Sequence, residues 1–357
     1  MRKGEWKIYF PLSPSLHFLP FSLIFYVFVS LCASVSLWLK LGYCSYFIYN
    51  IIHNMHFKNM FLILKAVIYL FVIILALSFL IVYLNSHPPR YPLNIPPSSY
   101  GLKFESVEFR TPDKILLRGW FVKSVSSMQY EAGRKKPVII ICHGLGANKS
   151  DFTELSSYLS KSGYHVLLFD FRGHGESKGN SSTLGFLEQD DLRSAVEYVK
   201  SRADVDIDKI GVYGFSLGAA VTILTASTEK DIKAVVSDSS FTSLKVQGER
   251  LLKSSLLPKM PFIYAATWIY EIMFKTDIDK IAPAHFIEKI SPTPIFIIGG
   301  EGDTQMPASD AEELFKNAGE PKSLWIVKGA SHGGTVISAG REYEKRIIEF
   351  FDKYLKE

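Results

Sequence analysis

The chain begins with two long apolar stretches. Residues 21–39 and 66–84 are each 19 residues long and contain no charged residue, Gly or Pro. At about 1.5 Å per residue, each would extend roughly 28 Å as an α-helix, close to the ~30 Å thickness of the hydrocarbon core of a bilayer. Both stretches are therefore predicted transmembrane helices within a membrane segment, residues 1–85, and the lipid bilayer is the first predicted partner.

Three other interpretations of this segment are a cleaved signal peptide and a buried core helix, neither of which fits well, and a shorter chain. A cleaved signal peptide is also apolar, but its apolar region has about 7 to 15 residues and ends in a small-residue cleavage site, which neither stretch has. A shorter chain starting at Met55 or Met60 would keep only the second helix, and residues 1–54 would then be an extension that is not translated. With one helix, Lys58 and Lys65 favour a cytoplasmic N-terminus, whereas with two the flanking charges nearly balance. The membrane side of the remaining chain therefore stays open.

The pattern changes after residue 85. Residues 86–100 hold five prolines, which favour extended chain and predict a semi-rigid spacer between the membrane and the C-terminal part of the chain. From residue 101 to 357, short β-branched runs alternate with amphipathic helical patterns, which is typical of an α/β fold with a mostly parallel sheet covered by helices on both faces. The predicted strands are 104–110, 116–122, 138–142, 165–170, 210–213, 232–237, 295–299 and 323–328.

Charge and cysteine content narrow the function. Residues 1–100 contain seven Lys or Arg and one acid, whereas residues 101–357 contain 33 basic and 34 acidic residues. The predicted α/β domain therefore offers no basic stripe for nucleic acid. The three cysteines, Cys32, Cys44 and Cys142, are too few and too scattered for a metal cluster or a disulfide framework. No metal and no cofactor is predicted.

The most informative motif follows the fifth predicted strand. Residues 214–218 read Gly-Phe-Ser-Leu-Gly, and an apolar helical pattern begins directly afterwards. A serine on such a strand-to-helix turn is pushed out over the sheet edge, and the flanking glycines leave room for the neighbouring backbone. The setting favours Ser216 as a nucleophile over an ordinary turn serine.

Further motifs follow other strands in a recognisable order. They are His143-Gly144-Leu145-Gly146, residues 170–177 (DFRGHGES), Gly302-Asp303 and Ser331-His332-Gly333. With the serine motif, residues 101–357 resemble the α/β-hydrolase superfamily, and within it the serine aminopeptidase-like and Bem46-like branch of membrane-anchored hydrolases. The resemblance implies a serine hydrolase that needs no cofactor and acts on an ester, thioester or peptide-like amide.

The resemblance also implies roles for single residues. Ser216 is the expected nucleophile, His332 its general base and Asp303 the acid that orients His332, in the chain order typical of the superfamily. Asp238, after the sixth strand, stays an alternative acid. The backbone N–H groups of Leu145 and Leu217 are the expected oxyanion donors, whereas His143, Asp170, Arg172 and His174 are expected to serve structure.

A long connection separates the sixth and seventh strands. Residues 241–290 exceed a simple crossover and hold an apolar run, residues 261–270, so they are predicted to form a lid over the site. Phe262 and Trp268 could line an acyl pocket or face the membrane, or the run could be a buried scaffold helix. The leading prediction is thus a membrane-anchored, single- or double-pass serine hydrolase. The alternative from another class is a catalytically silent scaffold with the same fold.

Overall fold

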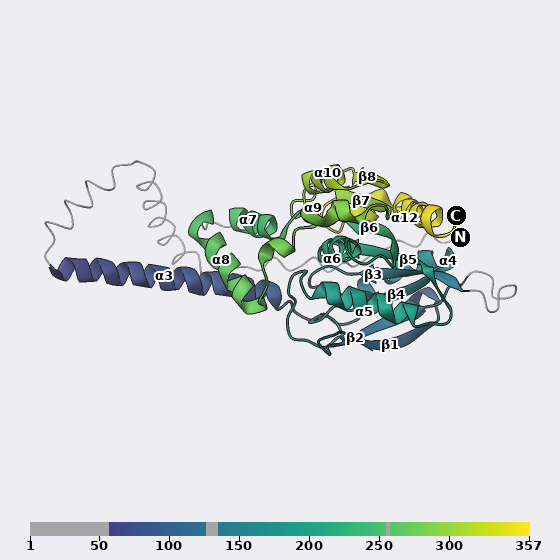
Figure 1. Ribbon diagram of the computed structural model, residues 1–357, viewed down its shortest axis with the longest axis horizontal. Coiled ribbons are helices and arrows are strands. Elements are labelled where there is room, and N and C mark those ends of the chain that lie inside the picture. The colour runs from purple at the N-terminus through teal and green to yellow at the C-terminus, as the bar shows by residue number, and fades with distance from the viewer. Residues whose placement is uncertain (1–56, 126–134, 255–257) are drawn as a thin grey trace, which may run out of the picture.

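The structure of the protein is a computed structural model that describes residues 57–125, 135–254 and 258–357 (Figure 1). The predicted helix at residues 21–39 lies outside these residues. The described chain forms a sheet domain from which one long helix projects (Figure 1).

Eight strands form one mixed sheet in the order β1-β2-β4-β3-β5-β6-β7-β8. β2 runs antiparallel to both of its neighbours, and all pairs from β4 onward are parallel. The strands are β1 (Phe104–Arg110), β2 (Leu116–Val122), β3 (Lys136–Cys142), β4 (His165–Phe169), β5 (Val205–Phe215), β6 (Ile232–Asp238), β7 (Ile295–Gly300) and β8 (Lys322–Val327).

The predicted mostly parallel eight-stranded sheet is confirmed. Seven strands begin and end within two residues of the prediction, and β5 is longer, because it starts at Val205 instead of Ile210. The early part of β5 is mostly polar, and Ile207 stands alone between Asp206 and Asp208 and is exposed, so this part lacks the apolar run on which the prediction depended.

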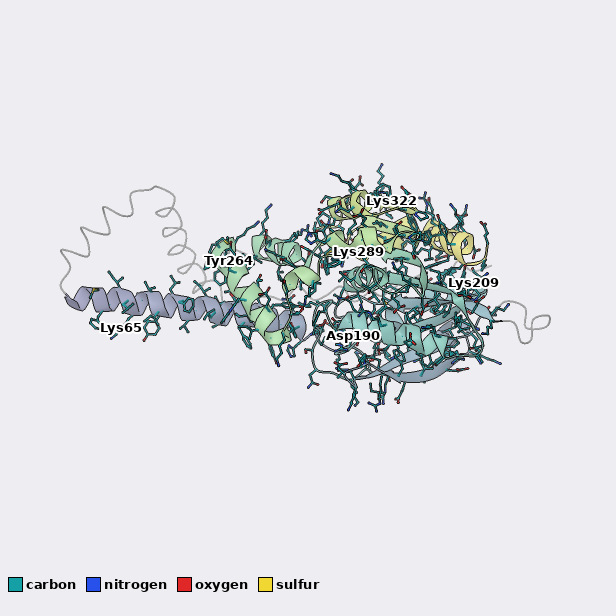
Figure 2. All side chains as sticks on the ribbon, viewed as in Figure 1. Lys65, Asp190, Lys209, Tyr264, Lys289 and Lys322 are labelled. Atoms are coloured by element: carbon teal, nitrogen blue, oxygen red, sulfur yellow. The ribbon has the colours of Figure 1, made fainter. Side chains whose placement is uncertain are left out.

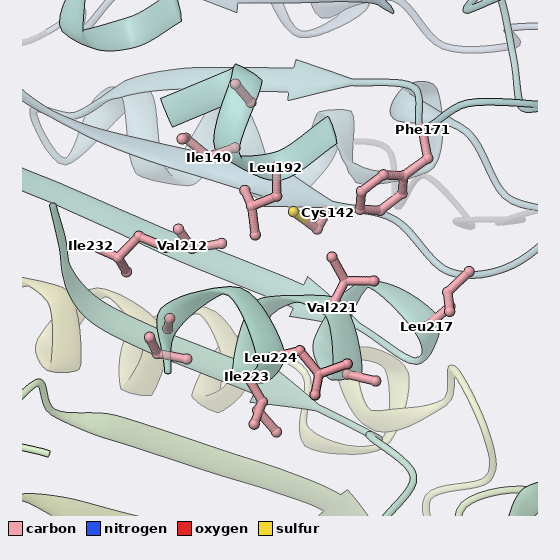
Figure 3. Close-up of a cluster of buried hydrophobic side chains, with 14 of the residues drawn as sticks. Ile140, Cys142, Phe171, Leu192, Val212, Leu217, Val221, Ile223, Leu224 and Ile232 are labelled. Atoms are coloured by element: carbon pink, nitrogen blue, oxygen red, sulfur yellow. The ribbon is translucent and has the colours of Figure 1, made fainter. Parts of the chain in front are cut away.

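Helices cover both faces of the sheet. One face packs against α5 (Glu188–Lys200), α6 (Leu217–Ala226) and α10 (Ala308–Asn317), and the other against α4 (Thr153–Lys161) and α12 (Arg341–Leu355). Successive side chains of a strand point to opposite faces, so Ile140 joins the first core while Ile139 and Ile141 join the second. Figure 3 shows the first core, in which Leu217 and Phe171 lie together at one end.

The long helix is α3 (Phe57–Ser86), with 30 residues. Within the described residues, Met60–Ser86 is the one helix long and apolar enough to cross a membrane. Large apolar side chains are exposed from Met60 at one end to Leu84 at the other. Figure 2 labels Lys65 on the part of α3 that lies far from the sheet.

Residues 86–100 lie against the sheet domain and do not form the predicted spacer. Ser182 N donates to Ser86 O at 2.7 Å, and Thr153 Oγ1 donates to Ile95 O at 2.6 Å. The segment ends in a short 3₁₀ helix, η1 (Pro97–Tyr100), whose Pro97 is buried. The spacer prediction is wrong because these contacts dock the segment on the domain. The prolines favour extended chain, but they do not indicate whether that chain is free or docked.

Arg90 holds this segment most firmly. Its guanidinium donates to four backbone carbonyls of the loop after β4, those of His174, Gly175, Ser177 and Gly179, at 2.5 to 3.3 Å. Five N–H donors in a rigid fork suit Arg to such a set of acceptors. From the sequence, Arg90 counts only as a charge flanking a predicted transmembrane helix.

The predicted lid segment, residues 241–290, is mostly helical in its described parts. It contains α7 (Leu244–Ser254), α8 (Lys259–Phe274), η3 (Ile278–Lys280), α9 (Pro283–Phe286) and η4 (Ile287–Ile290). In Figure 1, α8 crosses α3 where α3 meets the domain. Phe262 is fully buried in a cluster with Ile74 of α3 and Leu252 of α7, so it supports the scaffold and does not line a pocket.

Candidate active site

Ser216 occupies the sharp turn between β5 and α6. Its backbone has φ 54° and ψ −115°, a conformation that non-glycine residues rarely adopt. Ser216 N donates to Asp238 O at 2.9 Å, and Ser216 O accepts from Ala220 N in the first turn of α6. Strain held at one residue by surrounding structure is typical of functional sites.

The two glycines around Ser216 are required by close backbone contacts. A Cβ at Gly214 would lie 2.4 Å from Gly218 O, and a Cβ at Gly218 would lie 2.2 Å from Cys142 O. Both distances are far below van der Waals contact. The glycine spacing in the sequence therefore reflects how tightly α6 packs onto the ends of β3 and β5.

Three side chains from distant parts of the chain meet at this turn. His332 Nε2 lies 3.1 Å from Ser216 Oγ, and His332 Nδ1 lies 2.7 Å from Asp303 Oδ2. Ser216 follows β5, Asp303 follows β7 and His332 follows β8, so all three come from the carboxyl edge of the sheet. Ser216 and Asp303 are buried, and the His332 side chain is 16% exposed.

The Asp303 carboxylate is fixed on both of its oxygens. Oδ1 accepts from the backbone N–H groups of Gln305 and Met306, both at 2.8 Å, which leaves Oδ2 for His332. Gly302 N also donates to Ala330 O at 2.9 Å, so the loops that carry the acid and the imidazole are joined directly. The imidazole is thereby held with Nε2 toward Ser216.

Asp238, the alternative acid, has other partners in the structure. Its Oδ2 accepts from Thr335 Oγ1 at 2.8 Å and from Tyr343 Oη at 2.6 Å, and its Oδ1 accepts from Ser239 Oγ at 2.8 Å. Burial raises the pKa of the Asp238 carboxyl, although these donors oppose the shift. The structure pairs His332 with Asp303, while Asp238 ties the end of β6 to the helices that follow His332.

The two expected oxyanion donors flank Ser216. Leu217 is the first residue of α6, and a first-turn N–H has no acceptor inside its own helix. Leu145 follows the turn at Gly144, where an added Cβ would lie 3.3 Å from Ser216 Cβ. Both backbone segments therefore lie next to the serine.

His143, expected to serve structure, is buried below this turn. Its Nδ1 lies 2.7 Å from Gly144 O, and its Nε2 accepts from Phe171 N at 3.0 Å. Burial lowers the pKa of His143 to about 3, so the ring stays neutral and can accept that hydrogen bond. His143 links the turns after β3 and β4.

The loop after β4 is held by buried ion pairs. Asp170 Oδ2 accepts from Lys149 Nζ at 2.6 Å, and both side chains are fully buried. Arg172 pairs with Asp191 of α5 at 2.6 Å and with Asp113 at 2.8 Å. Structural roles for Asp170 and Arg172 were expected from the sequence, but the role of Lys149 was not, because the polar run Asn148–Asp151 is typical of an exposed loop.

Further sites for a metal or ligand are few. Within residues 57–125, 135–254 and 258–357, no group of three or more His, Cys, Asp or Glu side chains could hold a metal ion. A surface hollow lined by Ser323, Leu324 and Arg346 lies at the start of β8, the edge of the sheet opposite Ser216. It therefore has no connection with the serine.

Comparisons with known proteins agree with this architecture. Residues 137–265 match the family model described as alpha/beta hydrolase fold. The chain is 32% identical over 235 residues to the uncharacterized protein Rv2307c of Mycobacterium tuberculosis (66% of this chain and 74% of the relative). It is 28% identical over 289 residues to protein bem46 of Schizosaccharomyces pombe (78% and 89%).

A solved structure is similar over most of its length. The esterase Pf2001 of Pyrococcus furiosus has a TM-score of 0.62 and 28% identity, over 76% of this chain and 99% of the esterase. Fold, motif order and these relatives agree: the chain belongs to the α/β-hydrolase superfamily, with bem46 among its homologues.

Proposed function

We propose that this protein is a membrane-anchored serine hydrolase that cleaves a carboxylic ester, thioester or peptide-like amide through an acyl-enzyme intermediate. The single observation that carries the proposal is the continuous hydrogen-bonded line from Ser216 through His332 to Asp303, at 3.1 and 2.7 Å. Similarity to an esterase over 99% of the esterase's length supports it. No cofactor is needed for this chemistry.

Each residue has one task in the proposed reaction. Ser216 Oγ attacks the carbonyl carbon while its proton passes to His332 Nε2, and Asp303 stabilises the imidazolium. The N–H groups of Leu145 and Leu217 donate to the oxyanion, and one such donor typically contributes about 3 kcal/mol of transition-state stabilisation. The imidazolium then protonates the leaving group as its bond to the carbonyl carbon breaks. Water then attacks the acyl carbon while its proton passes to His332 Nε2, the bond from that carbon to Ser216 Oγ breaks, and His332 returns the proton to Ser216 as the acid leaves.

A fluorophosphonate probe tests this proposal directly. The probe forms a bond to a serine oxygen only when the serine is activated, so full-length protein should be labelled and Ser216→Ala should not. Ser239→Ala is a matched control, since Ser239 is a buried serine with positive φ that contacts Asp238 and not His332. Folded protein that resists the probe would favour the silent scaffold.

Membrane anchoring is the second part of the proposal. It is supported by the length of α3, the exposure of its apolar side chains and its projection away from the sheet domain (Figure 1). In water, an exposed apolar surface of this size would be unfavourable. A hydrocarbon environment removes that cost.

Two charges on α3 should release the protein from membranes. Ile68 and Val72 are 52% and 54% exposed, so changing both to Lys leaves the helix but adds about 2.5 to 3.5 kcal/mol of insertion cost per residue near the bilayer centre. Wild-type protein should stay in the pellet after alkaline extraction, and Ile68→Lys/Val72→Lys should move to the supernatant. Ile68→Ala/Val72→Ala should stay in the pellet. The three proteins are compared in a chain that begins at Met55 and so lacks the predicted helix at residues 21–39, where equal retention of all three would contradict anchoring by α3.

A further inference from the structure

Three large side chains form an exposed row on α8. Tyr264, Trp268 and Ile272 are spaced four residues apart on one face and are 63%, 56% and 56% exposed. Figure 2 shows Tyr264 on the part of α8 next to α3. Lys259 and Lys275 are exposed charges at the two ends of the helix, and Glu271, next to Ile272, is half-buried and accepts from Ile278 N at 3.3 Å. We call these three residues the outer row of α8.

The opposite face of α8 is already occupied. Phe262 and Ile263 pack against Ile74 of α3, and Ile269 and Tyr270 join the main core. Tyr270 Oη also donates to Thr183 O at 2.5 Å. Because these contacts fix α8 between α3 and the sheet domain, the outer row cannot turn inward without losing them.

The outer row lies beside the apolar surface of α3. The contacts of α8 involve α3 between Leu70 and Ile81, while Phe79, Tyr83 and Leu84 stay exposed on the side of α3 that α8 does not cover. A bilayer that covers α3 as far as Leu84 therefore reaches the level of α8. Tyr and Trp are enriched where a membrane meets water, which suits the row.

The same end of the molecule carries the proposed active site. A Cβ added at Gly146, in the turn of the proposed oxyanion donor Leu145, would lie 4.0 Å from Pro88, two residues after α3. Val82 of α3, Ile269 of α8 and Leu217, next to Ser216, belong to one apolar cluster. The edge of the sheet that carries Ser216 is therefore the edge on which α3 and α8 are docked.

We propose that the outer row of α8 enters the same leaflet as α3, and that Ser216 acts on carboxylic esters whose acyl chain lies in that leaflet. This inference rests on the proposed function and names its substrate class. The row lies on the helix that is docked with α3 at the edge of the sheet that carries Ser216. Lys259, which pairs with Glu249 at 3.4 Å, and Lys275 lie at the two ends of α8.

Lipid contact can be measured without turnover. Full-length protein with Cys32→Ser and Cys44→Ser retains only the buried Cys142, so a single cysteine at Tyr264, Val72 or Ile207 can carry an environment-sensitive fluorophore. In phosphatidylcholine nanodiscs, the labels at 264 and 72 should shift to the blue and be quenched by nitroxide-labelled lipid. The label at 207, on the exposed early part of β5, should show neither effect.

Turnover tests the substrate class. Trp268→Glu should lower the ratio of 4-methylumbelliferyl palmitate turnover in nanodiscs to 4-methylumbelliferyl acetate turnover by about tenfold, because a carboxylate disfavours entry into the leaflet. Ile207→Glu, an equal change on an exposed apolar residue far from α8, should leave the ratio at the wild-type value. Fluorophosphonate labelling of each variant checks that the protein is folded and that Ser216 is still reactive.

The outcomes separate this inference from the proposed function. If the label at position 72 is quenched and the label at position 264 is not, the inference is overturned while the anchor remains. If Trp268→Glu leaves the ratio of palmitate to acetate turnover unchanged, the substrate class is overturned. Loss of quenching at both positions removes the anchor and the inference together. Absence of fluorophosphonate labelling in folded wild-type protein removes the hydrolase itself.

Discussion

Asp303→Asn should lower kcat by about 10⁴-fold, because an amide can donate to His332 Nδ1 and thereby select the wrong imidazole tautomer. Asp303 Oδ2 is the acceptor at 2.7 Å from Nδ1, while the other oxygen is held by two backbone N–H groups. The side chain should therefore keep its position in the variant. Steady-state hydrolysis of a short soluble ester measures the loss.

Asp238→Asn is the matched control, since it makes the same change in the alternative acid. Asp238 accepts from the hydroxyls of Thr335, Tyr343 and Ser239, and a hydroxyl can also accept a hydrogen bond from an amide, so Asn should be tolerated at this position. We expect kcat to fall by less than about tenfold in Asp238→Asn. Equal losses in both variants would contradict the assignment of Asp303 as the acid.

Lys149→Ala should destabilise the fold by about 3 to 5 kcal/mol, the usual result of removing one partner from a buried ion pair. Lys149 Nζ donates to Asp170 Oδ2 at 2.6 Å and to Glu176 Oε2 at 2.7 Å, and it lies 4.9 Å from the ring of Trp120. Without the cation, the fully buried carboxylate of Asp170 has no opposite charge beside it. Thermal unfolding in nanodiscs measures the change.

A surface pair provides the comparison. Lys345 lies 3.7 Å from Glu349 on α12 and its side chain is 71% exposed, so Lys345→Ala should change stability by less than about 1 kcal/mol. The double variant Lys149→Met/Asp170→Asn should recover part of the lost stability, because it removes both charges together. If Lys149→Ala melts at the temperature of Lys345→Ala, the buried pair has no stabilising role.

Most of the sheet could be predicted because its interior strands are continuous apolar runs. Ile139 to Ile141 and Val235 to Val236 are buried on both faces, so hydropathy alone finds them. The early part of β5 was missed, since its single apolar residue between Asp206 and Asp208, Ile207, forms no such run. The candidate site residues could be named because Ser216 lies in a Gly-x-Ser-x-Gly turn and the other motifs follow their strands in the order typical of the α/β-hydrolase superfamily.

Contacts between segments distant in sequence could not be predicted. Nothing in the local sequence indicates that Arg90 meets carbonyls more than 80 residues away, or that Lys149 is buried beside Asp170. Phe262 could equally have lined a pocket or packed in a scaffold, and only the position of α3 decides this. These features depend on tertiary packing, on which hydrophobic periodicity carries no information.

The docking of α3 also bears on how the isolated domain should be studied. Cutting the chain at residue 86 would remove Ile74 and Val82, and so uncover apolar side chains of α7 and α8 such as Leu252, Phe262 and Ile263. A truncated protein would therefore be prone to association through this surface. The full chain in nanodiscs is the appropriate preparation.

The Arg90 contacts fix the angle at which the domain is attached to α3. With four carbonyls bound by one guanidinium, the domain cannot rotate freely on α3, and in the proposed anchored enzyme the edge that carries Ser216 would keep one orientation toward the lipid. Such an enzyme would find its substrate by lateral diffusion in two dimensions. Its rate would then follow the mole fraction of ester among the surrounding lipids, and adding plain lipid at constant total ester would slow it by surface dilution.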